Sequence, residues 1–218
     1  MTDRKLEVKG ESLILMGEKT LYWQEQKTLL AADVHLGKDT TFRKSGIAVP
    51  EAVSDQDLNR LSMALSRTGA ERLILLGDFL HARLGCSQML IEKVTTWRKT
   101  LESIEVILVM GNHDQASGGP PGSWNFKTVN DVFKDGPFSF THHPGSAKNT
   151  YTICGHIHPA VRLIGKGKQS AKLPCFYFEQ DLAIMPAFGS FTGTAVIEPR
   201  KNSKVYPVAD NTIIELES

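Results

Sequence analysis

All seven histidines of this 218-residue chain lie in five short blocks, and each block also carries a residue of a kind that suits a metal site. The blocks are Asp33-Val34-His35, Gly77-Asp78-Phe79-Leu80-His81, Gly111-Asn112-His113-Asp114, Thr141-His142-His143-Pro144 and Gly155-His156-Ile157-His158. Histidines that serve as ordinary core or surface residues would be scattered along the sequence. Imidazole, carboxylate and amide donors without a thiolate suit borderline divalent metals such as Mn, Fe or Zn.

Seven of these side chains form the candidate ligand set. Asp33 and His35 alternate by two, as do His156 and His158, so on an extended backbone each pair would face one side. Three further residues complete the set: Asp78, Asn112 and His142. Seven donors are more than one closed metal site can bind, but they fit two ions that share a carboxylate. Such a pair of ions clamps the attacking and leaving oxygens of a phosphoryl displacement. Glycines at 77, 111 and 155 would let the backbone turn sharply into the ligand loops.

Three of the blocks follow apolar runs that read as buried strands. The runs are Thr28–Ala32, Arg72–Leu76 and Val106–Met110, and each ends directly before a block. A helix is expected between the first two strands and another between the second and third, which indicates a partly parallel α/β sheet. The carboxyl ends of such strands are where ligands bind, because neighbouring loops converge there.

The two helices have recognisable end signals. The first is expected to open at Pro50, with Ser54 and Asp57 as a capping box, and to stop at Gly69. The second is expected over Ser87–Leu101. Residues 115–122 have no periodicity and are expected to form a loop near the site.

The remaining segments read mainly as strands. Three hairpin strands are expected near the N-terminus, around Leu6–Val8, Leu13–Met16 and Leu21–Trp23. Seven more are expected after the loop: Pro137–Thr141, Tyr151–Cys154, Val161–Ile164, Cys175–Phe178, Leu182–Met185, Ala195–Ile197 and Lys204–Val208. Residues 166–168 read as a turn between two of them. The expected architecture is a two-sheet core with helices outside, formed by residues 1–218 as a single domain.

The composition is that of an ordinary globular protein, with 41% hydrophobic and 22% charged residues. A net charge of +1 gives no global attraction for nucleic acid, so a polyanion would need a local basic patch. The three cysteines form no CxxC pair, which favours a reducing compartment. Charges interrupt every apolar run near the N-terminus, and no run is long enough to span a bilayer. A cytoplasmic location without membrane association is expected.

In this order, the five blocks resemble those of the calcineurin-like metallophosphoesterase superfamily. The stretches 35–50 and 186–193 also resemble a narrower branch, the DNA ligase-associated metallophosphoesterases of bacteria. The resemblance extends from about Leu13 to the last strands. It implies an α/β class fold, a four-layer α/β/β/α sandwich in which helices flank two mixed sheets and a dinuclear metal site lies at the strand ends.

The resemblance also implies roles for individual residues. One divalent ion would be held by Asp33, His35, Asp78 and His158, and the other by Asp78, Asn112, His142 and His156, so that Asp78 bridges them. His113 would stabilise or protonate the leaving oxygen. Asp114 would hydrogen-bond His113 and fix its orientation. Manganese is the favoured metal, with iron or zinc as alternatives.

Several neighbours of the blocks have more than one interpretation. His142 is favoured over His143 as the ligand, because only one of two adjacent side chains can enter the site. His81 either caps its loop or lies near the substrate. Lys38 and Arg43 are candidate phosphate contacts, with solvated charges as the alternative.

Apolar and basic residues outside the ligand set also have alternatives. Cys154 is favoured as a core residue. Phe188 and Phe191 are favoured as core side chains, although in a glycine-rich segment they could stack on a base. The basic run Lys166, Lys168 and Lys172 reads as a solvated turn rather than a nucleic-acid contact.

Three functions remain open. The first is a metal-dependent phosphodiesterase that acts as a single-strand DNA endonuclease in bacterial DNA repair, associated functionally with a DNA ligase, a helicase and an exonuclease. Its DNA substrate rests on the resemblance alone. The second is a phosphodiesterase or phosphomonoesterase for small substrates such as cyclic nucleotides, which would need a closed pocket. The third, a metal-free protein-binding scaffold, is disfavoured because no ligand is missing.

Overall fold

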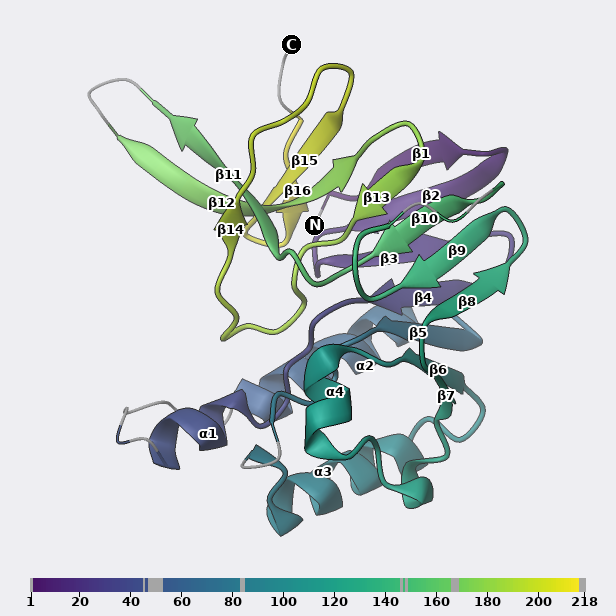
Figure 1. Cartoon of the computed structure of the whole chain (residues 1–218), viewed down its shortest axis with the longest axis vertical. Coiled ribbons are helices and arrows are strands. Elements are labelled where there is room, and N and C mark those ends of the chain that lie inside the picture. The colour runs from purple at the N-terminus through teal and green to yellow at the C-terminus, as the bar shows by residue number, and fades with distance from the viewer. Residues whose placement is uncertain are drawn as a thin grey trace.

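Two mixed β-sheets form the centre of the molecule (Figure 1). The computed structural model describes residues 2–44, 46, 53–82, 85–145, 147, 149–165 and 169–215. The first sheet has seven strands in sequence order: β1 (Arg4–Val8), β2 (Glu11–Met16), β3 (Thr20–Trp23), β4 (Thr28–Ala31), β5 (Arg72–Leu76), β6 (Glu105–Val109) and β7 (Lys127–Val129). Strands β1 to β4 pair antiparallel, whereas β4 to β7 run parallel, so the carboxyl ends of the last four share one edge.

The second sheet contains the other nine strands, with the order β14-β11-β12-β13-β10-β9-β8 and with β15 and β16 attached through β12. These strands are β8 (Val132–Asp135), β9 (Phe138–Thr141), β10 (Tyr151–Cys154), β11 (Pro159–Ile164), β12 (Ser170–Phe178), β13 (Leu182–Ile184), β14 (Ala195–Val196), β15 (Lys204–Ala209) and β16 (Thr212–Ile213). Strands β9, β10 and β13 are parallel, which brings the ends of β9 and β10 to one edge.

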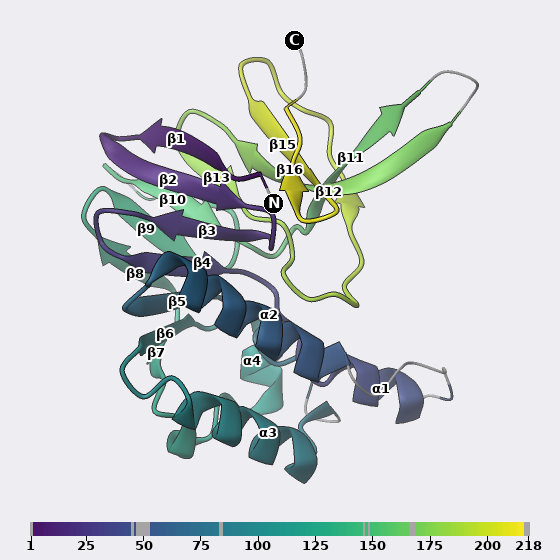
Figure 2. The same cartoon turned by 180° about the vertical axis from the view of Figure 1, so that it is seen from behind.

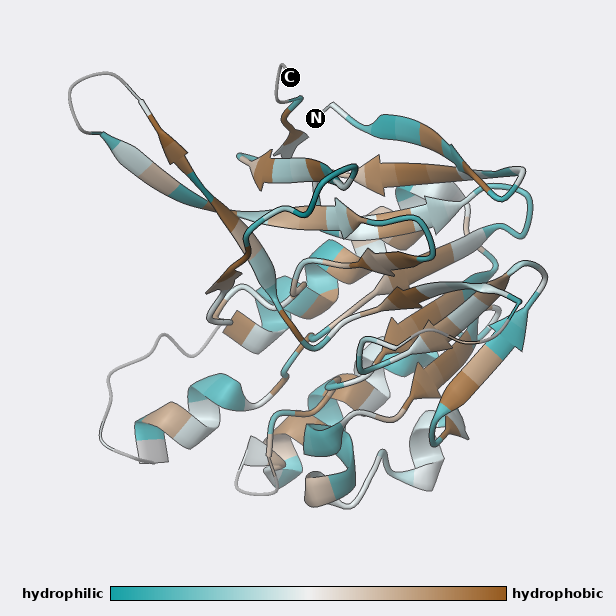
Figure 3. Cartoon of the chain, turned by 45° about the horizontal axis from the view of Figure 1, so that its top comes forward, coloured by the Kyte–Doolittle hydropathy of each residue, from teal (hydrophilic) through white to brown (hydrophobic). Residues whose placement is uncertain are grey.

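Alternation along the parallel strands divides their side chains between two cores. In β4, Leu30 enters the core between the sheets, and Leu29 enters the core between the first sheet and the helices. Both faces of the strand are therefore dry, which explains why these strands read as continuous apolar runs. Figure 3 shows the same concentration of hydrophobic residues along the central strands.

The helices of the described chain lie beside the first sheet (Figures 1 and 2). They are α1 (Lys38–Lys44), α2 (Val53–Thr68), α3 (Gln88–Lys99), α4 (Asn112–Ser117) and the short 3-10 helix η2 (Gly122–Trp124). Leu61 of α2 and Val94 of α3 pack against the strands in the helix-side core. Ser87 caps α3, since its hydroxyl accepts a hydrogen bond from the Leu90 N–H at 3.2 Å.

The fold class expected from the sequence, two mixed sheets with helices outside, is confirmed. One detail of the expected four-layer α/β/β/α sandwich differs: within the described residues, no helix covers the outer face of the second sheet (Figures 1 and 2). Cys154, Tyr177 and Ile184 form a small apolar cluster with Ile157 and Val205 instead. The core between the sheets draws on both halves of the chain, as a single domain requires. The single-domain assignment stays a prediction.

The expected capping box of α2 is wrong, although the helix itself is present. Ser54 and Asp57 lie inside α2 and bind other segments: the Ser54 hydroxyl donates to Asp39 at 3.1 Å, and Asp57 accepts from the Ser190 backbone N–H at 3.0 Å. Tertiary partners thus take the side chains that the local pattern assigned to the helix end. The expected start at Pro50 and the expected turn at 166–168 lie outside the described residues.

The loop expected over residues 115–122 is also partly wrong. Residues up to Ser117 belong to α4, and Gly122 begins η2. The end signals of α4 were present in the sequence: Asp114 caps the Gly111 N–H, and Gly118 ends the helix in the left-handed conformation at φ 92°. The helix has only 6 residues. This length is too short for a helical hydrophobic period to show in the sequence. None of the described helices is long and apolar enough to cross a membrane.

Candidate metal centre

Backbone hydrogen bonds join the first two ligand loops directly to each other. Beyond β4 and β5, the His35 N–H donates to the Asp78 carbonyl at 2.8 Å, and the Leu36 N–H donates to the Phe79 carbonyl at 2.8 Å. Leu36 and Leu80 form an isolated parallel bridge. The parallel register of the strands therefore continues into the loops and sets Asp33, His35 and Asp78 side by side.

Five of the seven candidate ligands have a left-handed backbone. Their φ angles lie between 50° and 70°, at Asp33, His35, Asp78, His156 and His158. This conformation is uncommon for residues other than glycine and costs about 1–3 kcal/mol each. The expectation that Asp33–His35 and His156–His158 alternate on an extended backbone is therefore wrong. Both pairs still reach the site, where the His35 and His158 rings meet and the His156 N–H donates to Asp33.

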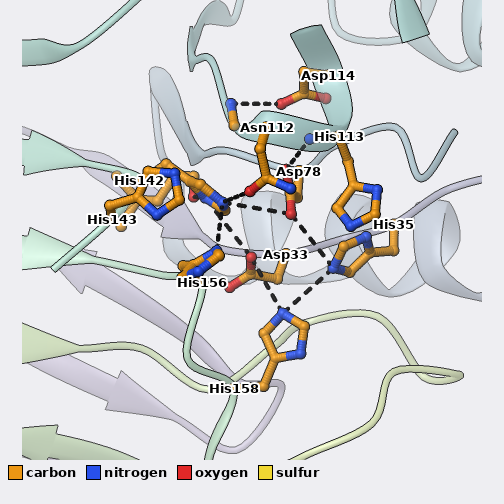
Figure 4. Close-up of polar contacts among 12 residues, drawn as sticks. Asp33, His35, Asp78, Asn112, His113, Asp114, His142, His143, His156 and His158 are labelled. Atoms are coloured by element: carbon orange, nitrogen blue, oxygen red, sulfur yellow. Dashed lines mark hydrogen bonds and ion pairs between the residues drawn. The ribbon is translucent and has the colours of Figure 1, made fainter. Parts of the chain in front are cut away.

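Two buried carboxylates occupy the middle of the cluster (Figure 4). Each commits one oxygen to a backbone N–H: Asp33 Oδ2 accepts from His156 at 2.8 Å, and Asp78 Oδ1 accepts from His113 at 2.9 Å. Their second oxygens face the imidazoles on both sides. Asp78 Oδ2 lies 3.4 Å from His142 Nε2 and 3.8 Å from His35 Nε2. Asp33 Oδ1 lies 3.4 Å from His158 Nε2 and 3.8 Å from His142 Nδ1.

The other candidate ligands form two groups on opposite sides of these carboxylates. On one side, His35 Nε2 and His158 Nε2 are 3.3 Å apart. On the other, His142 Nε2 lies 3.1 Å from Asn112 Oδ1 and 3.1 Å from His156 Nδ1. The structure therefore gathers all seven expected ligands into two groups joined by Asp33 and Asp78. The geometry allows either carboxylate to bridge, so the assignment of this role to Asp78 stays a prediction.

The chemistry of the donor set fits divalent cations. Asp33 Oδ1 is buried and accepts no hydrogen bond, which leaves a negative oxygen in need of a cation. Burial lowers the pKa of His35 to about 2, and burial together with neighbouring histidines lowers that of His156. Neutral imidazoles are the form that binds metals. Burial acts to raise the pKa of Asp78, but hydrogen bonds and charges, those of His142 first, bring it down to about 2.

Backbone carbonyls orient two of the imidazoles, a feature that the sequence could not reveal. His142 Nδ1 lies 3.0 Å from the Leu76 carbonyl, and His158 Nδ1 lies 3.0 Å from the Gly193 carbonyl. Each contact directs Nε2 toward the carboxylates and sets the tautomer, as second partners of metal-bound histidines do. A carbonyl carries no residue-type signal, so only the fold identifies it.

His113 and His81 lie together on the His35 side of the cluster. The His81 and His113 rings stack at 4.9 Å between centroids, and His113 packs edge-on against His35 at 5.2 Å. His81 Nδ1 is 3.4 Å from His35 Nδ1. Burial, followed by the charge of Lys38, lowers the pKa of His81 to about 4. His81 therefore lies against His113 and His35, and its role near the substrate stays a prediction.

The expected contact between Asp114 and the His113 ring is replaced by another. Asp114 Oδ1 accepts from the Leu80 N–H at 2.8 Å, and Oδ2 accepts from the Gly111 N–H at 3.0 Å. Burial raises its pKa to about 6. Asp114 therefore joins the loops that carry His81 and His113 through their backbones, and the sequence-based role for its side chain is wrong.

The glycines that open three of the blocks provide space for ligands rather than sharp turns alone. Of Gly77, Gly111 and Gly155, only Gly77 has a positive φ, at 78°. A Cβ at Gly111 would lie 2.2 Å from Asp78 Oδ1, and one at Gly155 would lie 2.6 Å from Asp33 Oδ2. The backbone thus passes so close to the two central carboxylates that no side chain fits between them.

We expect Gly111→Ala to lower diesterase activity and metal affinity by about 10–100-fold, the range seen when the partners of metal ligands are displaced. The added methyl group must push Asp78 aside. Gly122→Ala is the matched control, because nothing lies within 4 Å of its Cβ position. Metal titration followed by activity assay checks both variants. Equal affinities would show that Asp78 does not depend on this close approach.

The remaining sequence candidates divide between the site and the scaffold. Lys38, a half-buried residue, lines the same small cavity as His35, and its charge lowers the pKa of both His35 and His81. Arg43 instead binds Thr40 and Asp39 of its own helix at 3.2 and 3.6 Å. His143 is exposed, with its ring 4.1 Å from that of His156. Cys154 is fully buried in the core, as expected.

Comparison with known proteins supports the same chemistry. The family model of calcineurin-like phosphoesterases matches residues 26–183, about three quarters of the chain. No curated protein gives a significant match. The crystal structure of Pseudomonas putida nuclease MPE is similar, with 33% sequence identity and a TM-score of 0.86 over 98% of this chain and 100% of that one.

Two further structures are more distant. The phosphoesterase Yfce from E. coli has 12% identity and a TM-score of 0.42 over 86% of this chain and 96% of that one. A predicted phosphoesterase from Streptococcus pneumoniae has 13% identity and a TM-score of 0.30 over 84% and 83%. The family model and the two groups of ligands lead to one conclusion: the chain belongs to the calcineurin-like phosphoesterase family.

Proposed function

We propose that this metallophosphoesterase cleaves phosphodiester bonds of single-stranded DNA as an endonuclease. The observation that carries the proposal is the pair of ligand groups joined by Asp33 and Asp78, with His113 beside them. The similarity to a nuclease over almost the whole chain supports a nucleic-acid substrate. The presence of every candidate ligand disfavours the metal-free scaffold.

Each ligand group would hold one divalent ion. Asp33, His35, Asp78 and His158 are assigned to one ion, and Asp78, Asn112, His142 and His156 to the other. When bound, the two ions supply Lewis-acid activation of water and of the phosphate oxygens. The donor set of imidazole, carboxylate and amide is compatible with manganese, our preferred metal, and with iron or zinc.

The residues around the ions have separate tasks in this proposal. His113 is assigned to the leaving oxygen, to which it donates a proton as the P–O bond breaks. His81 keeps the His113 ring in place through stacking. Lys38 contributes positive charge on the same side, where it would attract a phosphate. A role for Arg43 in substrate binding would require it to leave Asp39.

The biological setting completes the proposal. We propose a cytoplasmic enzyme of bacterial DNA repair that works alongside a DNA ligase, a helicase and an exonuclease. Three reduced cysteines, one half-buried and two buried, suit a reducing compartment.

We expect the purified protein with Mn²⁺ to linearise circular single-stranded DNA and to hydrolyse bis-p-nitrophenyl phosphate. A closed circle has no ends, so its cleavage demonstrates endonuclease activity. Gel electrophoresis follows the DNA, and absorbance follows the small diester. Turnover of the small diester with no cleavage of DNA would support the small-substrate alternative. If neither activity appears with Mn²⁺ or with any other divalent metal, the phosphodiesterase assignment itself is contradicted.

A further inference from the structure

Phe191 is an exposed aromatic side chain at the edge of the metal centre. It is 40% exposed, whereas Phe188, three residues earlier in the same segment, is fully buried. Among the described residues, Phe191 is the only aromatic one in the set of exposed large hydrophobic side chains. The sequence favours a core position for both phenylalanines. In the structure, Phe188 belongs to the core, whereas Phe191 faces solvent.

The segment that carries Phe191 is fixed to the site at both ends. The Gly189 N–H donates to the Asp33 carbonyl at 3.1 Å, and the Gly193 carbonyl lies 3.0 Å from His158 Nδ1. Between them, Asp57 of α2 accepts from the Ser190 hydroxyl at 2.6 Å. Phe191 is thus two residues from each of the glycines that contact Asp33 and His158, about 7 Å of chain at most on either side.

The surroundings of Phe191 form a small platform. Phe42 of α1 packs edge-on against its ring, with centroids 5.5 Å apart and planes at 83°. Such a contact stabilises one edge of the ring, and the exposed fraction shows that part of the ring surface stays accessible. Phe191, His35 and Lys38 line the same small cavity. An apolar ring and a cation therefore lie next to each other on the His35 side of the metal centre.

We propose that Phe191 is a stacking platform for a nucleobase adjacent to the scissile phosphate. The inference rests on the proposed function and adds the contact that selects the substrate. An exposed phenyl ring beside a cation and a metal centre suits a ligand that carries both a flat aromatic group and a phosphate. The ring can stack only on an unpaired base, so it favours single strands over duplexes without reading their sequence.

The test compares Phe191→Ala, Phe191→Trp and wild type on two fluorescent oligonucleotides that differ only in their bases. One is a normal single strand, and the other carries tetrahydrofuran abasic residues throughout. Loss of one stacking contact corresponds to a KM about tenfold higher. We expect Phe191→Ala to show this rise on the normal strand with little change in kcat, and Phe191→Trp to restore the wild-type KM. Met63→Ala, which removes another exposed apolar side chain, on α2, is the control.

The abasic strand separates stacking from a structural effect. Wild type and Phe191→Ala are expected to have the same KM on it, because there is no base to stack. An equal rise on both strands would overturn the proposal, since Phe191 would then only position the loop. No rise on either strand would also overturn it. Failure of the wild type to cleave either strand, with activity on bis-p-nitrophenyl phosphate, would contradict the proposed DNA substrate instead.

Discussion

Asp78→Asn is expected to lower diesterase activity on the order of 10³-fold, beyond the 10–100-fold range of partners that only orient metal ligands. The substitution preserves the size of the side chain and an acceptor for the His113 N–H, which Asp78 Oδ1 binds at 2.9 Å. It removes the charge that faces His142 on one side and His35 on the other. Both ligand groups are expected to lose affinity, because a neutral amide replaces the carboxylate to which we assign the bridging role.

Metal content distinguishes this effect from simple misfolding. We expect elemental analysis after equilibration with Mn²⁺ to show fewer ions per chain in Asp78→Asn than in wild type. Mn²⁺ should also raise the melting temperature of wild type more than that of the variant, since an ion that binds only the native state stabilises it. Asp210→Asn is the matched control, an exposed turn carboxylate with a φ of 48° that asparagine tolerates. Unchanged metal content in Asp78→Asn would contradict the bridging role.

The ligand set was predictable because its signal is one of residue type and strand position. Asp33, Asp78 and Asn112 each follow an apolar strand, and parallel strands bring such positions to one edge whatever the details of the loops. The second sheet adds His142 and His156 by the same rule, since β9 and β10 are parallel neighbours. Topology alone therefore gathers the donors once the strands are recognised.

The conformations inside the site were not predictable from the same signal. Extended geometry is the default reading of an alternating pair, but His35 and His158 both have a left-handed backbone. This state is unfavourable for an isolated residue. It persists here because contacts from distant segments fix it, such as the bond from His35 N–H to Asp78 carbonyl. Local sequence carries no record of these contacts.

The predicted side-chain contact of Asp114 was wrong for a related reason. Asp114 is one residue from His113, and proximity in sequence suggested a contact between their side chains. The carboxylate turns instead toward the backbone N–H groups of Leu80 and Gly111, which lose no hydrogen bond on burial as a result. Buried backbone N–H groups need a hydrogen-bond acceptor. Which N–H groups are buried beside Asp114 becomes known only once the fold places the loops together.

His113→Ala is expected to lower kcat by about 10²–10⁴-fold on DNA, the range for loss of a positioned general acid. The leaving group of DNA is an alkoxide of high basicity, so its departure requires a proton. The p-nitrophenolate ion departs without one. We therefore expect a far smaller loss on bis-p-nitrophenyl phosphate, and the ratio of the two losses measures the contribution of proton transfer.

The geometry makes this ratio interpretable. His113 binds Asp78 through its backbone N–H, which alanine retains, and its ring contacts those of His35 and His81 without belonging to the proposed ligand set. Metal content should therefore be unchanged in His113→Ala. Equal losses on both substrates with full metal content would assign His113 to electrostatic stabilisation of the phosphate. Loss of metal would make it a ligand, and full activity on DNA would remove it from the mechanism.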